Sequence, residues 1–97
     1  MDKMVYFNEL YDLYGELLTD KQKNYFEDYY FNDLSFSEMA ENYGVSRNAI
    51  FKQIHIVTDK LEEYEAVLKI YEKRNKLLEI AKAVDNESIK KQLEELL

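Results

Sequence analysis

Apolar residues recur at helical spacing along most of the chain. Residues 3–18 carry two neighbouring apolar stripes, so the predicted first helix has a wider apolar face than a surface helix needs. That face is expected either to pack between two other helices or to form a dimer surface. The stripes consist of Tyr6, Leu10, Leu13 and Leu17, and of Phe7, Tyr11, Tyr14 and Leu18.

Capping signals predict where the next helices begin and end. Two capping boxes open helices that are predicted to run to about Tyr30 and to Tyr43. Gly44 is expected to end the second of them in the left-handed conformation, which costs glycine no Cβ clash. Ser46 is then a good N-cap for the helix that follows. The two capping boxes are Thr19 with Gln22, and Ser35 with Glu38.

From Arg47 to about Val84 nothing interrupts the helical pattern. Its apolar residues alternate four and three apart, which is the heptad seam of a coiled coil. One expectation is a long helix that pairs with its counterpart in a homodimer, with Asn75 fixing the register. The other is a bend near Glu62–Glu65 that folds the helix back over the first one. A terminal amphipathic helix is predicted after Asp85, its expected N-cap. The seam consists of Ile50, Ile54, Val57, Leu61, Tyr64, Leu68, Tyr71 and Leu78.

Composition narrows the fold class to all-α. The 97 residues contain no proline and only two glycines, too few turn residues for a β-rich fold. We expect a single domain over residues 1–97, with a helix-turn-helix within 35–54 and a helical extension over 61–97. The chain has no cysteine, no leader-like start and no apolar run of about 20 residues, so we expect a cytoplasmic protein without membrane contact.

The stretch from residue 35 to 54 has the steric pattern of a helix-turn-helix. Ala40 is small where the two helices would cross closely, and Gly44 allows the sharp turn. Val45 is expected to fill the angle between the helices. Ile50 and Ile54 are expected to anchor the second helix to the core.

Several segments carry a resemblance to known proteins. Residues 18–22, 34–41 and 44–50 resemble region 4 of the sigma-70 factors. The whole chain resembles the YlxM family of small acidic bacterial proteins, through its Tyr-rich first helix, residues 17–25 and the run 60–65. The resemblance implies a sigma-70 region 4-like helix-turn-helix bundle with a long C-terminal helical extension. It also implies a regulatory role in the signal recognition particle pathway, an association made through genes that lie beside that of the particle's GTPase.

The start and outer face of the helix after Ser46 are predicted to contact double-stranded DNA. A recognition helix presents its N-terminal residues to base edges in the major groove. Arg, Asn and Gln side chains suit bidentate base contacts, and a serine at a helix N-terminus suits a phosphate. Likeness to sigma region 4 adds Ser37 as a second phosphate contact. The predicted DNA-binding residues are Ser37, Ser46, Arg47, Asn48, Lys52 and Gln53.

The charge distribution limits how tightly such DNA binding can be. The net charge is -7, and residues 1–45 account for it with three Lys against ten Asp and Glu. Residues 46–60 form the one positive segment, with three Lys and Arg against one Asp. Few basic side chains neutralise few phosphates, so we expect weak, salt-sensitive binding by a monomer and useful affinity from a homodimer.

No pattern indicates catalysis, a cofactor or a metal site. His55 has no second imidazole or thiolate near it in sequence, and no glycine-rich phosphate loop is present. We therefore expect a non-enzymatic protein. An alternative to DNA binding is a protein-interaction module whose acidic, tyrosine-rich first two helices bind the signal recognition particle GTPase, without a DNA role.

Overall fold

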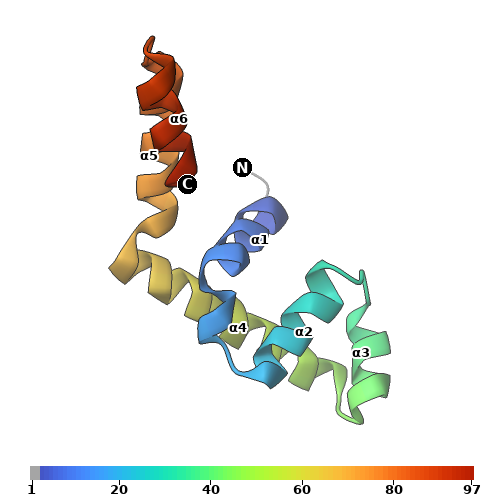
Figure 1. The fold of residues 1–97 in the computed structure, drawn as a ribbon. Helices are drawn as coiled ribbons and strands as arrows, with labels where there is room; N and C mark the ends of the chain where they lie inside the picture. Colours follow the sequence, from blue (N-terminus) through green and yellow to red (C-terminus); the bar gives the residue numbers. More distant parts are fainter. Residues whose placement is uncertain (1–2) are drawn as a thin grey trace.

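The computed structural model describes residues 3–97, which form six α-helices, one short 3-10 helix and no strand. This confirms the all-helical fold class. The first four helices form a bundle, and the last two form a hairpin that projects away from it (Figure 1). None of the helices in the described part of the chain is long and apolar enough to cross a bilayer. The helices are α1 (Lys3–Tyr14), α2 (Asp20–Tyr30), α3 (Phe36–Tyr43), α4 (Arg47–Leu68), α5 (Ile70–Ala83) and α6 (Glu87–Glu95).

Helix α4 is the element against which the bundle is built. One buried cluster joins α1 and α2 to the middle of α4, through Val57 and Leu61. A second joins α2 and α3 to its beginning, through Ile50 and Ile54. These four side chains are the first half of the predicted heptad seam, and the protein's own helices cover them. The seam is therefore not open to a coiled-coil partner, and that prediction is wrong.

The wide apolar face of α1 is buried between helices, as one of the two sequence interpretations predicted. Leu10 and Tyr14 lie in the core with Phe26 of α2 and Val57 of α4. The continuous stripe to Leu17 is not observed, however. The chain turns into a 3-10 helix at Gly15–Leu17, and Leu17 is 56% exposed.

The long helix predicted from Arg47 ends at Leu68, so the chain neither continues straight nor bends near Glu62–Glu65. Lys69 adopts the left-handed conformation with φ 54°, and α5 leaves in a new direction. The α5 helix contacts α1, where the ring centroids of Tyr71 and Tyr6 lie 5.3 Å apart. The predicted contact with the first helix is thus confirmed, whereas the predicted position of the bend is wrong.

The predicted caps are confirmed with one exception. Both capping boxes form, with Thr19 and Ser35 each accepting a hydrogen bond from the backbone N–H three residues on, at 3.1 Å. The last helix is capped by Asn86 rather than Asp85, because the Asn86 side chain accepts hydrogen bonds from two backbone N–H groups, at 2.9 and 3.2 Å.

Candidate nucleic-acid interface

Helices α3 and α4 are joined by a three-residue turn that ends one helix and caps the next. Gly44 takes φ +68° at the end of α3. The Ser46 hydroxyl oxygen then accepts a hydrogen bond from the N–H of Ala49 at 3.0 Å, which fixes the start of α4. Both local predictions are confirmed. The turn sets the direction in which the first residues of α4 face solvent.

The packing between α3 and α4 differs from the prediction at one position. Ala40, Ile50 and Ile54 are buried as expected. Val45 is 42% exposed and does not fill the angle between the helices. Met39 of α3 is fully buried in the same cluster as Ile50 and Ile54. The long, flexible side chain of Met39 reaches the core from within α3. The shorter side chain of Val45, in the turn, remains partly exposed to solvent.

Three of the predicted DNA-binding residues lie together at the start of α4. Arg47 and Asn48 are exposed and line a shallow hollow with the rings of Phe36 and Phe51. Lys52 is exposed one helical turn beyond Asn48, on the same side of the helix. The residues with the strongest hydrogen-bonding and charge capacity therefore share one accessible surface.

The remaining predicted residues occupy less favourable positions. Gln53 is half-buried, unlike Arg47, Asn48 and Lys52. Ser37 is exposed in the first turn of α3, beside Ser35, which caps that helix. Ser46 is exposed, and its hydroxyl proton is not used in the cap, where the oxygen is the acceptor.

The sequence did not identify two aromatic residues of this surface, Phe36 and Phe51, as site residues. Phe51 is 47% exposed, and its ring lies 6.0 Å from that of Phe36 and 4.4 Å from the His55 imidazole, measured between centroids. The signal in the sequence is the spacing of four that places Arg47, Phe51 and His55 on one side of α4. The exposed surface beside Arg47 is therefore partly aromatic.

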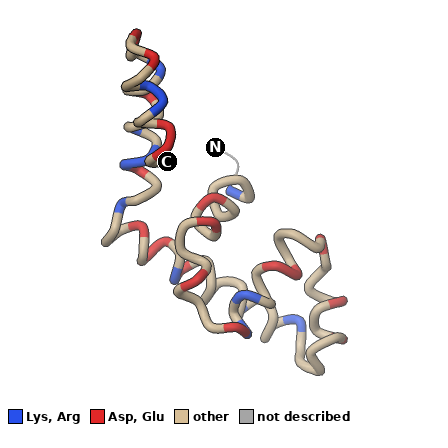
Figure 2. Tube along the Cα trace, viewed as in Figure 1, with Lys and Arg blue, Asp and Glu red and all other residues tan. Residues whose placement is uncertain are grey.

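The first helix of the motif carries negative charge. Figure 2 shows acidic and no basic positions along α3, and its two charged residues, Glu38 and Glu41, are exposed. Hydrogen bonds from the Ser35 backbone N–H and hydroxyl lower the pKa of Glu38. The first helix of a helix-turn-helix crosses the phosphate backbone of bound DNA, and these charges oppose that contact.

The described residues show no arrangement suited to a bound metal ion: within residues 3–97, no three or more His, Cys, Asp or Glu side chains are grouped for one. The surface at the start of α4 presents hydrogen-bond donors, the two positive charges of Arg47 and Lys52, and the exposed ring of Phe51.

Comparison with known proteins places the chain beside small bacterial helix-turn-helix proteins. The family model UPF0122, described as "Putative helix-turn-helix protein, YlxM / p13 like", matches residues 1–97. A UPF0122 protein of Shouchella clausii is 44% identical over 88 residues, covering 87% of this chain and 81% of the relative. One from Halalkalibacterium halodurans is 40% identical over 101 residues, covering 100% and 93%. One from Ureaplasma urealyticum is 42% identical over 95 residues, covering 98% and 96%.

Proposed function

The chain belongs to the UPF0122 family of YlxM/p13-like helix-turn-helix proteins, and from this premise we propose that it is a non-enzymatic regulatory protein that binds double-stranded DNA in the cytoplasm. The observation that carries the proposal is the shared exposed surface of Arg47, Asn48 and Lys52 in the first two turns of α4. A helix that enters the major groove presents these turns to the bases.

Each proposed residue has a role that follows from its chemistry. Arg47 and Asn48 supply the bidentate donors and acceptors that read guanine and adenine edges. Lys52 neutralises a phosphate. The Ser46 and Ser37 hydroxyls, at the starts of α4 and α3, donate to phosphate oxygens. Gln53, being half-buried, contacts DNA only at the margin of the interface.

The small number of basic residues requires paired recognition helices for useful affinity. We propose that pairing runs through the α5–α6 hairpin, since the first half of the heptad seam is buried in the core and α4 ends at Leu68. The hairpin and the C-terminal residues expose several large apolar side chains to solvent. They are Leu78 (38% exposed), Ile80 (54%), Ile89 (48%), Leu96 (77%) and Leu97 (38%).

DNA binding is tested by selecting duplexes from a random library with the full chain at low salt, then measuring affinity for the enriched duplex. The substitution Arg47→Ala should cost about 1–3 kcal/mol of binding free energy. Lys60→Ala removes the same charge from a later, exposed part of α4 and should cost much less. A library that yields no enriched sequence, or equal losses in the two variants, contradicts the proposal.

A second candidate function is binding to a basic protein surface, which the YlxM resemblance associates with the signal recognition particle GTPase. The observation that favours it is an exposed acidic series that runs from the end of α1 through the 3-10 helix to the start of α2, namely Asp12, Glu16 and Asp20. Reversing these three charges should abolish co-purification with that GTPase, whereas Arg47→Ala should preserve it. Salt-dependent binding to a duplex that Arg47→Ala abolishes supports DNA binding as the function instead.

A further inference from the structure

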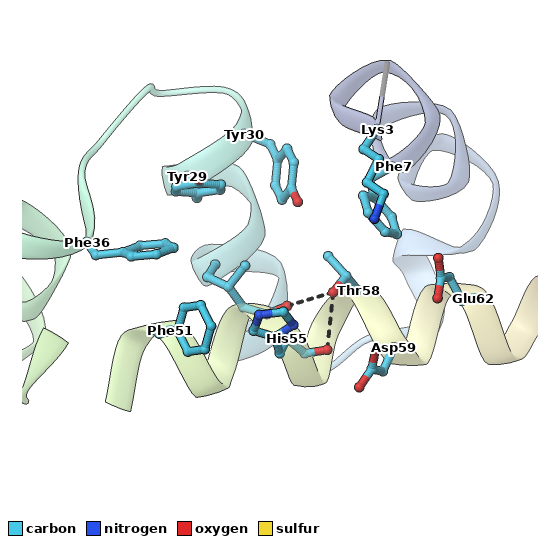
Figure 3. Close-up of a pocket in the computed structure, with 11 residues that line it drawn as sticks. Lys3, Phe7, Tyr29, Tyr30, Phe36, Phe51, His55, Thr58, Asp59 and Glu62 are labelled. Carbon is cyan, nitrogen blue, oxygen red and sulfur yellow. Dashed lines mark hydrogen bonds between the residues drawn. The ribbon is translucent and has the colours of Figure 1, made fainter. Parts of the chain in front are cut away.

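A groove of about 500 Å³ opens on one side of α4, between the N-terminal end of α1 and the ends of α2 and α3 that face it (Figure 3). It lies beside the base-reading surface, and the rings of Phe36 and Phe51 border both. Most of its lining is aromatic and comes from four different helices. The aromatic lining residues are Phe7, Tyr29, Tyr30, Phe36, Phe51 and His55.

The aromatic rings form a connected array rather than a closed core. The rings of Tyr29 and Phe36 stack with centroids 4.8 Å apart, and Phe36 meets Phe51 edge-on at 6.0 Å. Phe51 is 47% exposed, so the array is accessible from solvent. Accessible ring faces attract cations, and guanidinium groups stack on them especially well.

The charged groups along the groove are mainly negative. Asp59 and Glu62 lie three residues apart on α4 and are therefore neighbours on the helix surface. Both are exposed, and neither forms an ion pair within residues 3–97. The hydroxyl of Thr58 is occupied, because it donates to the carbonyls of Ile54 and His55 at 3.2 Å.

One cation of the chain itself borders the groove. The Lys3 side chain extends from α1 past Phe7 toward the α4 side, where the carboxylate of Glu62 points up toward it (Figure 3). A cationic side chain can therefore reach this space. The same residue acts as an internal competitor for any cation that comes from outside.

We propose that the groove binds an arginine side chain, flanked by apolar residues, from a partner protein. The guanidinium lies against the ring of Phe7 and pairs with Glu62, with the charge of Asp59 one helical turn away. The flanking apolar residues contact the aromatic array at Phe36 and Phe51. Charge complementarity favours this occupant over a nucleic acid, because phosphates would meet the two carboxylates. The inference does not depend on DNA binding, since neither Arg47 nor Asn48 takes part.

The test is an NMR titration of the 15N-labelled full chain, without nucleic acid, with the blocked peptide acetyl-Leu-Arg-Leu-amide. Amide shifts should be confined to the residues that line the groove. The double variant Asp59→Asn/Glu62→Gln should weaken binding about fivefold or more. Glu63→Gln removes an exposed carboxylate from the same helix outside the groove, and it should leave the affinity unchanged.

Lys3→Ala tests the sign of the ligand's charge. Removing the competing ammonium should tighten binding of the arginine peptide, whereas a groove for an anionic ligand would lose affinity. A peptide with norleucine in place of arginine should bind much more weakly. The proposal is overturned if the arginine peptide causes no shifts in the groove, if the norleucine peptide binds equally, if Lys3→Ala weakens binding, or if oligothymidylate produces the same shifts.

Discussion

The hydroxyl of Tyr14 donates a hydrogen bond of 2.5 Å to Oε1 of Glu65, which joins the end of α1 to the last turn of α4. The same carboxylate accepts from the N–H groups of Tyr71 and Glu72 at 3.0 and 3.1 Å. The N–H of Ile70 donates to the Tyr14 hydroxyl oxygen at 3.1 Å. Side chains of α1 and α4 thus satisfy backbone donors that the start of a helix leaves without intrahelical partners.

Replacing Glu65 with alanine should destabilise the protein and loosen the α5–α6 hairpin. The substitution leaves the Tyr14 hydroxyl and two backbone N–H groups without their acceptor, so the free energy of unfolding should fall by about 1–3 kcal/mol. Hydrogen exchange at Tyr71 and Glu72 should accelerate as well. Glu63→Ala, an exposed change on the same helix, should shift stability by no more than about 0.5 kcal/mol. Equal effects of the two substitutions would contradict this role for Glu65.

A double-mutant cycle should show that Tyr14 and Glu65 act as a unit. Tyr14→Phe keeps the buried ring and removes only the hydroxyl, so it should cost about 1 kcal/mol. Combined with Glu65→Ala, it should add less than this amount, because the bond is already absent. Urea denaturation of the four proteins measures the coupling. Strict additivity would show that the hydrogen bond contributes nothing to stability.

Gly44→Ala should destabilise the protein through backbone strain alone. No atom lies within 4 Å of the position that a Cβ would take, but the φ of +68° is unfavourable for alanine. The expected loss is about 1–2 kcal/mol by chemical denaturation. Gly44→Asn should lose less, since asparagine adopts this conformation more readily. If asparagine and alanine were equally destabilising, strain at φ would not be the cause.

The stability of the protein should depend on the ionisation of Tyr43 at alkaline pH. Burial, together with the 2.5 Å hydrogen bond to Asp28, raises the pKa of Tyr43 to about 12, against about 10 in an unfolded chain. The folded state holds the proton more tightly, so this contribution is complete below pH 10 and is lost as the pH rises through about 12.

Unfolding measured between pH 10 and about 12 should therefore show a shallower fall in stability for Tyr43→Phe than for the unmodified protein. Asp28→Asn, which removes the charge that faces the hydroxyl, should flatten the profile in the same direction. Identical slopes for all three proteins would exclude this linkage.

The proposed pairing through the hairpin predicts a change in association when its exposed apolar residues are made polar. Ile80→Ser/Ile89→Ser should convert a dimer to the 11.7 kDa monomer in analytical ultracentrifugation. Ile56→Ser, at a similarly exposed position on α4, is the matched control and should leave association unchanged. A monomeric unmodified chain at micromolar concentration would refute dimerisation outright.

Local signals in the sequence were sufficient for the helix-turn-helix. The caps at Thr19, Ser35 and Ser46 form as predicted, because each bond joins residues three apart. The left-handed Gly44 follows from the absence of a side chain at that position. The exposure of Arg47, Asn48 and Lys52 follows from the helical period once Ile50 and Ile54 are assigned to the core.

Burial of particular residues was less predictable, because it depends on which helix covers them. Val45 was expected in the angle between α3 and α4, yet it is 42% exposed, whereas Met39 is fully buried with Ile50 and Ile54. Gln53 has the chemistry of a base-reading residue and is half-buried. The spacing of four and three in α4 fits a coiled-coil partner and three helices of the same chain equally well, so periodicity did not distinguish them.

The sequence by itself determined that the chain is helical, where α2, α3 and α4 begin, and that a helix-turn-helix with a basic start of α4 is present. Only the tertiary structure decided the break at Lys69, since Tyr14 caps α5 from a position 56 residues away from Ile70. It also decided the aromatic groove, whose lining comes from four helices. The physical reason is the sequence distance over which each interaction acts. Caps and helical periods involve residues only a few positions apart, whereas burial and the hydrogen bonds between distant residues depend on how the helices pack.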